Sequence, residues 1–225
     1  MARPGSEGGF RPPRGRSCRR EKGSWAVEVL ILASKSASRR AMLDSAGVPY
    51  QAIAAGVDEE SAKLSLRAEG ISARNLADAL AELKATKLSH RHPTDLVLGC
   101  DSTLCFEDGA MIDKAASREE QRELLLRLSG QRHRLFSAAV ICEGGRPVWR
   151  HVDRAILHVR PLSKAFIDAY IESEWPAIGH CVGGYRLEAL GVQLFAKIEG
   201  SHFTILGLPL IGLLDYLRTR GVVSE

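Results

Sequence analysis

Residues 34–40 (SKSASRR) have the composition of a phosphate-binding loop. They follow residues 27–33 (VEVLILA), a continuous apolar run that predicts a buried strand, and they lead into a predicted helix. The start of such a helix presents free backbone N–H groups and positive potential to an anion. The hydroxyl groups of Ser34 and Ser36 would add further donors.

Arg39 and Arg40 lie at the start of the same predicted helix. Guanidinium groups bind phosphate oxygens through paired N–H donors, so the two side chains could grip a phosphate as a fork. The alternative interpretation is a helix capped by Ser36 or Ser38, with both arginines solvated.

Asp101 directly follows residues 95–100 (DLVLGC), which predict a second buried strand. In α/β proteins a carboxylate at the carboxyl end of a buried strand lies at the crevice where ligands bind. Asp101 could hold a divalent metal or act as a general base toward water. The alternative is a turn-forming aspartate that precedes Ser102.

Residues 56–60 predict a loop that carries three carboxylates, those of Asp58, Glu59 and Glu60. Hard oxygen ligands from this loop and from Asp101 would suit Mg²⁺ or Mn²⁺, which usually retain waters and bridge substrate phosphates. A solvated acidic loop is the alternative.

Three further charged residues are candidates on type alone: Lys84, Lys114 and Glu188. Most lysines are merely solvated. Glu188 lies in GGYRLEALG, where small neighbours permit close approach of backbone or ligand, although a structural turn explains the same pattern.

The net charge of +4 is concentrated in the first 24 residues. That segment holds seven basic and two acidic residues, a balance of +5, so the remainder is close to neutral at −1. The segment is rich in Gly, Pro and Arg, and we expect it to be disordered. A basic tail on a near-neutral body argues against nucleic acid as the partner.

The composition, with 45% hydrophobic and 26% charged residues, is that of an ordinary globular protein. No apolar stretch approaches the roughly 20 residues of a membrane span, so we expect no membrane association. The five cysteines include no CxxC pair, and apolar surroundings at Cys100, Cys142 and Cys181 predict buried reduced thiols and a cytoplasmic location.

Hydrophobic spacing and turn residues predict an α/β protein with a mixed sheet and a central hairpin, because strands and helices do not alternate regularly. We expect residues 1–24 to be a tail and residues 25–225 to be the folded domain. Further predicted strands are 49–54, 103–112 (a hairpin turning at Asp108-Gly109), 135–142, 147–159 and 192–198; further helices are 72–89, 119–128, 164–172 and 209–220.

Several signatures of other enzyme classes are missing from the sequence. It contains no GxxxxGK[ST], GxGxxG, GxSxG or HExxH motif. These absences argue against P-loop kinases, Rossmann oxidoreductases, α/β-hydrolases and zinc peptidases.

Six motifs in a single order resemble the Maf family of nucleoside triphosphate pyrophosphatases, from about Val27 to Gly221. They are LILASKSASRRAMLDSAGVPYQAIAAGVDEE, NLADALAELKA, VLGCDS, LSGQRHRL, GGYRLEALG and GLPLIGLLDYLR. The resemblance implies a curved mixed sheet flanked by helices, two lobes around a cleft, frequent homodimers, and metal-dependent cleavage of a nucleoside triphosphate between the α and β phosphates.

The resemblance also implies roles for individual residues. It places Ser34, Arg39 and Arg40 at the phosphate, Glu59 and Asp101 at a Mg²⁺ or Mn²⁺ ion, Asp101 as proton acceptor, Lys84 and Lys114 as catalytic lysines, and Glu188 near the base. On this basis the cations would neutralise the triphosphate and the leaving pyrophosphate, while Asp101 would orient or deprotonate the attacking water. A catalytically weak nucleotide sensor linked to cell division is the alternative.

Two departures from the common family pattern concern the choice of base. One more residue separates the serines from the arginines than in SxSPRR, and Glu188 stands where many members have Gln. Both features are similar to the subfamily described as 7-methyl-GTP pyrophosphatases. A carboxylate at this position could pair with a cationic or donor-rich purine edge.

Overall fold

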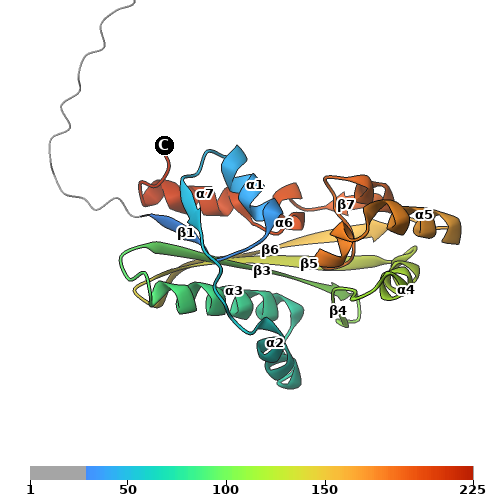
Figure 1. Ribbon diagram of the computed structural model, residues 1–225, viewed down its shortest axis with the longest axis horizontal. Helices are drawn as coiled ribbons and strands as arrows, with labels where there is room; N and C mark the ends of the chain where they lie inside the picture. The colour runs from blue at the N-terminus through green and yellow to red at the C-terminus, as the bar shows by residue number, and fades with distance from the viewer. Residues whose placement is uncertain (1–28, 225) are drawn as a thin grey trace, which may run out of the picture.

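The computed structural model describes residues 29–224, in which a seven-stranded mixed sheet has helices on both faces (Figure 1). The strand order is β2-β1-β3-β5-β6-β7, with β4 paired to part of β3. β1 (Leu30–Leu32) is parallel to β2 (Tyr50–Ala52) and to β3 (Leu96–Phe106). The remaining pairings are antiparallel and involve β4 (Met111–Ile112), β5 (Arg132–Glu143), β6 (Arg146–Val159) and β7 (Phe195–Glu199). The predicted α/β class with a mixed sheet is confirmed.

The helices divide between the two faces and one end of the sheet (Figure 1). Figure 1 shows α1 (Ala37–Ser45), α6 (His202–Ile205) and α7 (Leu210–Thr219) on one face, and α3 (Ala73–Ser89) on the other. α2 (Glu59–Ala68) packs on α3, while α4 (Arg118–Leu128) and α5 (Lys164–Glu174) pack together at the far end of the sheet. Two 3-10 helices, Ala177–His180 and Leu190–Leu194, complete the described elements.

Each group of helices encloses its own hydrophobic cluster. On the α1 and α7 face, Leu98 packs with Leu43 and Leu213, and at the far end Leu125 packs with Ile167. The third cluster lies under α3 and is built mostly from alanine and valine. Small side chains on α3 therefore let this helix lie close to the sheet.

Gly99 in β3 marks the closest approach between α3 and the sheet. A Cβ atom added there would lie 2.0 Å from the carbonyl oxygen of Ala81 and 2.7 Å from the amide nitrogen of Ala85. Both atoms belong to the helix backbone, which cannot move away without disrupting α3. A residue with a side chain is therefore excluded at this position, which is two residues before Asp101 in β3.

Most of the sequence-based elements are confirmed, but two are wrong. The predicted loop at 56–60 ends in α2, which Asp58 caps by accepting a hydrogen bond from the Ser61 amide. α2 has no buried residue and begins with Glu59 and Glu60, so its first turn has the same local sequence as a solvated acidic loop. The predicted strand at 192–198 begins as the 3-10 helix Leu190–Leu194, and β7 starts only at Phe195.

The predicted tail at 1–24 and the start of the predicted strand at 27–33 lie outside the described residues. Among residues 29–224, no helix is both long and apolar enough to cross a membrane. Cys100, Cys105 and Cys142 are buried free thiols and Cys181 is a half-buried one. The predicted burial is therefore confirmed for Cys100 and Cys142 and is wrong for Cys181.

Candidate active site

The candidate site lies at a gap along one edge of β3. On that edge β3 pairs with β1 at Leu96–Leu98 and with β4 at Leu104–Cys105. Between these pairings, at residues 99–103, no strand within the described range 29–224 covers the edge, although the other edge pairs with β5 throughout. The carboxyl ends of the parallel strands β1 and β2 open toward the same gap, as in other α/β ligand sites.

Asp101 lies inside β3, opposite Ala138 of β5, and the prediction that it follows the strand is wrong. The apolar run ends at Cys100, but pairing with β5 continues to Phe106. A long antiparallel partner therefore extends the strand through polar residues. The consequence is a carboxylate held by a strand rather than by a loop.

Lys84 joins the two carboxylates that the family resemblance assigns to a metal. Its Nζ atom lies 2.7 Å from Asp101 Oδ1 and 2.9 Å from Glu59 Oε2. The side chains of Lys84 and Asp101 are 8% and 9% exposed, whereas that of Glu59 is 45% exposed. The structure thus brings these three residues together, with one positive and two negative charges.

Arg39 is buried on the other face of β3, where its guanidinium group connects three segments. Nε donates to the Gly207 carbonyl at 2.7 Å, and the two terminal nitrogens donate to Ser34 Oγ at 3.3 Å and Ser102 Oγ at 3.2 Å. Ser36, one of the two serines that the sequence offers as a cap, caps α1 by accepting a hydrogen bond from the Arg39 amide. Arg39 and Ser34 therefore lie beside the gap, at the start of α1.

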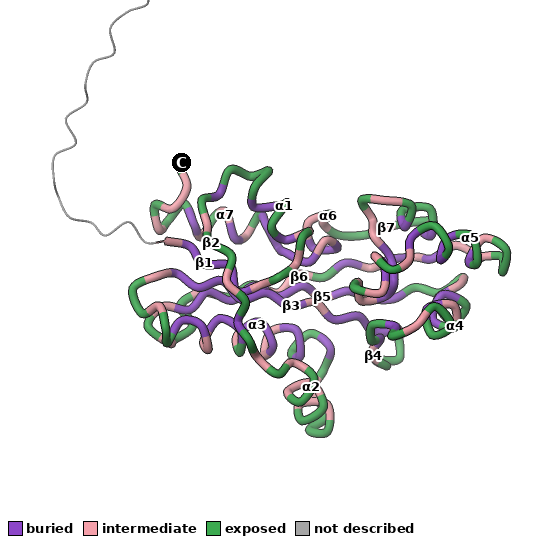
Figure 2. Tube along the Cα trace, viewed as in Figure 1, coloured by how far each residue is buried: buried purple, intermediate pink, exposed green. Residues whose placement is uncertain are grey.

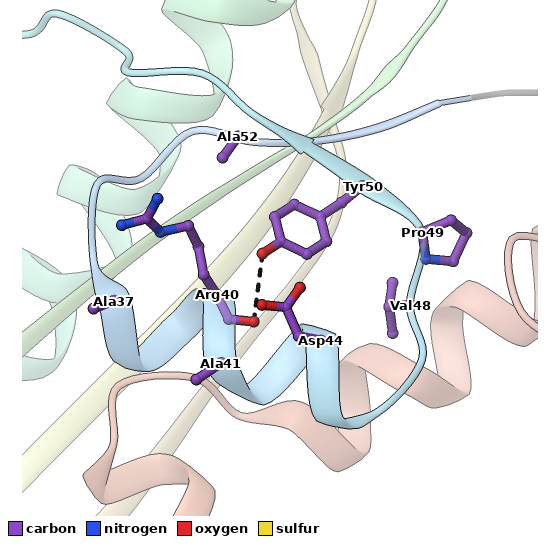
Figure 3. Close-up of a pocket in the computed structure, with 8 residues that line it drawn as sticks. All are labelled: Ala37, Arg40, Ala41, Asp44, Val48, Pro49, Tyr50 and Ala52. Atoms are coloured by element: carbon purple, nitrogen blue, oxygen red, sulfur yellow. Dashed lines mark hydrogen bonds between the residues drawn. The ribbon is translucent and has the colours of Figure 1, made fainter.

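Arg40 has different surroundings from Arg39, so the structure does not assemble the predicted fork. Arg40 is exposed and lines an open pocket of about 660 Å³ with Asp44 and Tyr50. Figure 3 shows its guanidinium group extending between Ala37 and Ala52, while its carbonyl oxygen accepts a hydrogen bond from the Tyr50 hydroxyl. Adjacent helical residues point about 100° apart, which separates the two arginines.

Lys114 and Glu188 are both exposed, and both lie near the half-buried Cys181 thiol. Burial raises the pKa of that thiol and the Glu188 carboxylate raises it further, while the cationic Arg186 and Lys114 lower it. Lys114 also borders a small cavity of about 10 Å³ beside Ser102 and Thr103. Glu188 and Lys114, which comes two residues after β4, therefore act on the same thiol from two distant segments of the chain.

Comparison with known proteins places this arrangement in a family. Residues 29–220 match the Maf-like protein family. The chain belongs to that family. A nucleoside triphosphate pyrophosphatase of Caulobacter vibrioides is 52% identical over 199 residues, which cover 88% of this chain and 99% of the relative. Proteins of the same name from Ruegeria pomeroyi and Sphingopyxis alaskensis are 50% and 49% identical, over 87% and 88% of this chain and 98% and 100% of the relatives.

The carboxylate oxygens of this Maf-like site are donors of the kind that a divalent cation prefers. Glu59 and Asp101 direct carboxylate oxygens at a single point, the Lys84 ammonium. In residues 29–224, no group of three or more His, Cys, Asp or Glu side chains forms a complete metal cage. Two carboxylates completed by water and phosphate are an arrangement that Mg²⁺ accepts.

Sequence reasoning missed several polar residues at the gap. Ser102 accepts from Arg39 and lies 2.8 Å from Ser137 Oγ, and Thr103 Oγ1 donates to the Ala73 carbonyl at 2.6 Å. The period of two in a strand through Asp101 would have placed Ser102 on the opposite face. The contact with Gly207 has no comparable local signal, because 168 residues separate it from Arg39.

Proposed function

We propose that this protein hydrolyses nucleoside triphosphates between the α and β phosphates, releasing a nucleoside monophosphate and pyrophosphate. The observation that carries the proposal is the buried Lys84–Asp101 pair at the uncovered edge of β3, with Arg39 on the opposite face. The names of the three relatives support the same activity.

The start of α1 is suited to the phosphates. Two of the Arg39 nitrogens donate hydrogen bonds to neutral serine hydroxyls, at 3.2 and 3.3 Å. A phosphate oxygen is a stronger acceptor than either hydroxyl. The bond to the Gly207 carbonyl holds the guanidinium group in place while its outer nitrogens engage the ligand. Ser34 provides a further hydroxyl beside them.

Asp101 is the candidate general base toward the attacking water. Its carboxylate is almost fully buried, and the Lys84 ammonium provides a charged hydrogen bond to one of its two oxygens. This contact orients the carboxylate and leaves the second oxygen for the water. No side chain needs to form a covalent intermediate, so position and charge supply the catalysis.

Glu59 and Asp101 would hold the divalent cation. When bound, the ion would withdraw charge from the phosphates and lower the barrier to attack. Lys84 and Lys114 would balance the negative charge that collects on the departing pyrophosphate. We also propose that Arg40 contributes from the rim rather than as a partner of Arg39, because its guanidinium group is solvent-exposed.

The test of this function is Asp101→Asn, which keeps the size of the side chain and removes the basic oxygen. We expect turnover to fall by about 10²- to 10⁴-fold with the fold retained, measured as pyrophosphate release from nucleoside triphosphates with Mg²⁺. Asp215→Asn, an exposed change on α7, is the matched control. Pyrophosphate release at a normal rate from the Asp101 variant would contradict the assignment.

We further propose that Glu188 favours a cationic purine such as 7-methylguanine, since its carboxylate is exposed and lies near the same thiol as Lys114. Rates on 7-methyl-GTP, GTP, UTP and dTTP should favour the methylated nucleotide roughly tenfold, the value of one good charge-assisted contact. Glu188→Gln should remove most of that preference. Equal wild-type rates on all four bases would refute this part of the proposal, and no release from any of them would favour a nucleotide-sensing role.

A further inference from the structure

Helix α2 directs two basic side chains, Lys63 and Arg67, toward the small cavity beside Ser102. They are one helical turn apart and so lie on the same side of α2. Lys63 is only 18% exposed, although its ion-pair partner Glu60 is 82% exposed and stands 3.5 Å away. The lysine therefore lies against the protein rather than extending with Glu60 into solvent.

Arg67 ties α2 to the opposite wall of the cavity. Its terminal nitrogens donate to the two carboxylate oxygens of Asp113, each at 2.8 Å. Its Nε atom is buried without a hydrogen-bond partner. Asp113 immediately precedes Lys114, so this contact places α2 and Lys114 on two sides of the same cavity.

The charges around the cavity are unbalanced. Three cations border it, Lys63, Arg67 and Lys114, and Asp113 is the single carboxylate among its lining residues. Neighbouring positive charges of this kind attract an anion and are stabilised by one. The cluster of Lys84 with Glu59 and Asp101 has the opposite excess, one positive and two negative charges.

Ser102 connects the cavity to the start of α1. It lines the cavity and also accepts the hydrogen bond from Arg39 at 3.2 Å. A polyphosphate chain that contacts Arg39 can therefore pass Ser102 and reach the cations of α2.

We propose that Lys63 and Arg67, together with Lys114, bind the terminal phosphates of the nucleotide, which become the leaving pyrophosphate. The cavity volume of about 10 Å³ is room for one water, so the phosphates would lie at its rim, where the three cations reach them. The inference rests on the proposed function and adds a helix that sequence reasoning did not assign. In this arrangement α2 delivers Glu59 from its first turn and the two cations from its later turns. Binding of the triphosphate would thereby hold α2 against the gap.

The experiment compares Lys63→Gln with wild type in two assays at a fixed excess of Mg²⁺. In the first, calorimetry without turnover measures binding of inorganic pyrophosphate and of a nucleoside monophosphate. Loss of one charge-assisted contact should weaken pyrophosphate binding roughly tenfold and leave monophosphate binding unchanged. In the second, steady-state pyrophosphate release should show a KM raised by a similar factor.

Three further variants separate a phosphate contact from a structural role. Lys63→Arg keeps the charge and should restore most of the affinity for pyrophosphate. Lys164→Gln removes an exposed lysine at the start of α5 and should behave as wild type. Arg67→Lys keeps a cation in the cavity while it weakens the paired contact with Asp113, and should lower affinity less than Lys63→Gln.

The outcomes distinguish this inference from the proposed function. Unchanged pyrophosphate affinity in Lys63→Gln, or an equal loss for pyrophosphate and monophosphate, would overturn the subsite even if the enzyme turns over. Wild-type protein that binds pyrophosphate through Lys63 but hydrolyses no nucleoside triphosphate would retain the subsite and refute the proposed function.

Discussion

Helices α2 and α3 each supply one charged side chain to the same ion-pair cluster, but they are held in opposite ways. α3 carries Lys84 on a long buried face, whereas α2 carries Glu59 and has no buried residue (Figure 2). α2 lies between Gly56 and Gly70, both with positive φ, and its ties to other elements include the Glu59–Lys84 and Arg67–Asp113 ion pairs.

Because of this difference, the two helices position their charged side chains by different kinds of contact. Core packing determines where Lys84 and Asp101 lie, because α3 touches β3 at Gly99. Polar contacts determine where Glu59 and the cations of α2 lie, and such contacts are worth little against solvent. Changes in α3 should therefore reduce stability, and changes in α2 should reduce function.

The largest effect is expected where α3 contacts the sheet. Gly99→Ala should destabilise the protein by about 4 kcal/mol or more, because its Cβ atom would overlap the backbone of α3. Urea unfolding measures the loss. The control is Gly212→Ala in α7, where an added Cβ meets ordinary contacts at 3.5 Å or more and alanine favours the helix. Equal unfolding midpoints for both variants would show that α3 is not held as described.

The second effect is a loss of stability at low pH, which limits the pH at which variants of α2 and α3 can be compared. His133 is fully buried at the far end of the sheet, 2.8 Å from the Tyr185 hydroxyl, and burial lowers its pKa to about 4. Its unfolded pKa is 6.5, so the unfolded chain takes up a proton first as pH falls. Stability from this group is present above pH 6.5 and is lost between 6.5 and 4.

At pH 5 the free energy of unfolding should be about 2 kcal/mol lower than at pH 8, because the pKa of His133 differs between the folded and unfolded states. Unfolding curves across this range test it, and His133→Gln should be less stable at pH 8 but should lose less on acidification. An identical pH slope in wild type and variant would assign the acid sensitivity to other groups. The stabilities of α2 and α3 variants should therefore be compared above pH 6.5.

The smallest effect on stability, with a clear effect on activity, is expected in α2. Glu59→Gln should change the free energy of unfolding by less than about 1 kcal/mol, since the Glu59 side chain is 45% exposed. The Mg²⁺ concentration needed for half-maximal activity should rise about tenfold, because one of two carboxylate ligands is lost. Glu69→Gln, an exposed change at the C-terminal end of α2, is the control. A stability loss as large as that of Gly99→Ala would remove the distinction between the helices.

Sequence alone determined the charged residues of this site and most of the elements that carry them. A serine cap at 36 or 38, the helix over residues 72–89 and the hairpin after β3 follow from local spacing and turn chemistry, which do not depend on distant partners. The family motifs added the expectation that Glu59, Lys84 and Asp101 lie together, and the structure brings them together.

Only the tertiary structure decided how those residues are held. β3 continues through Asp101 because β5 pairs with it, and its other edge stays uncovered because β1 is short, so strand pairing between distant segments creates the gap. The turn of about 100° per helical residue separates Arg39 from Arg40. The carbonyl of Gly207, which is distant in the sequence, accepts a hydrogen bond from Arg39. The cations of α2 had no signal in the sequence, because the cavity that Lys63 and Arg67 border forms only when α2 meets distant residues such as Ser102 and Lys114.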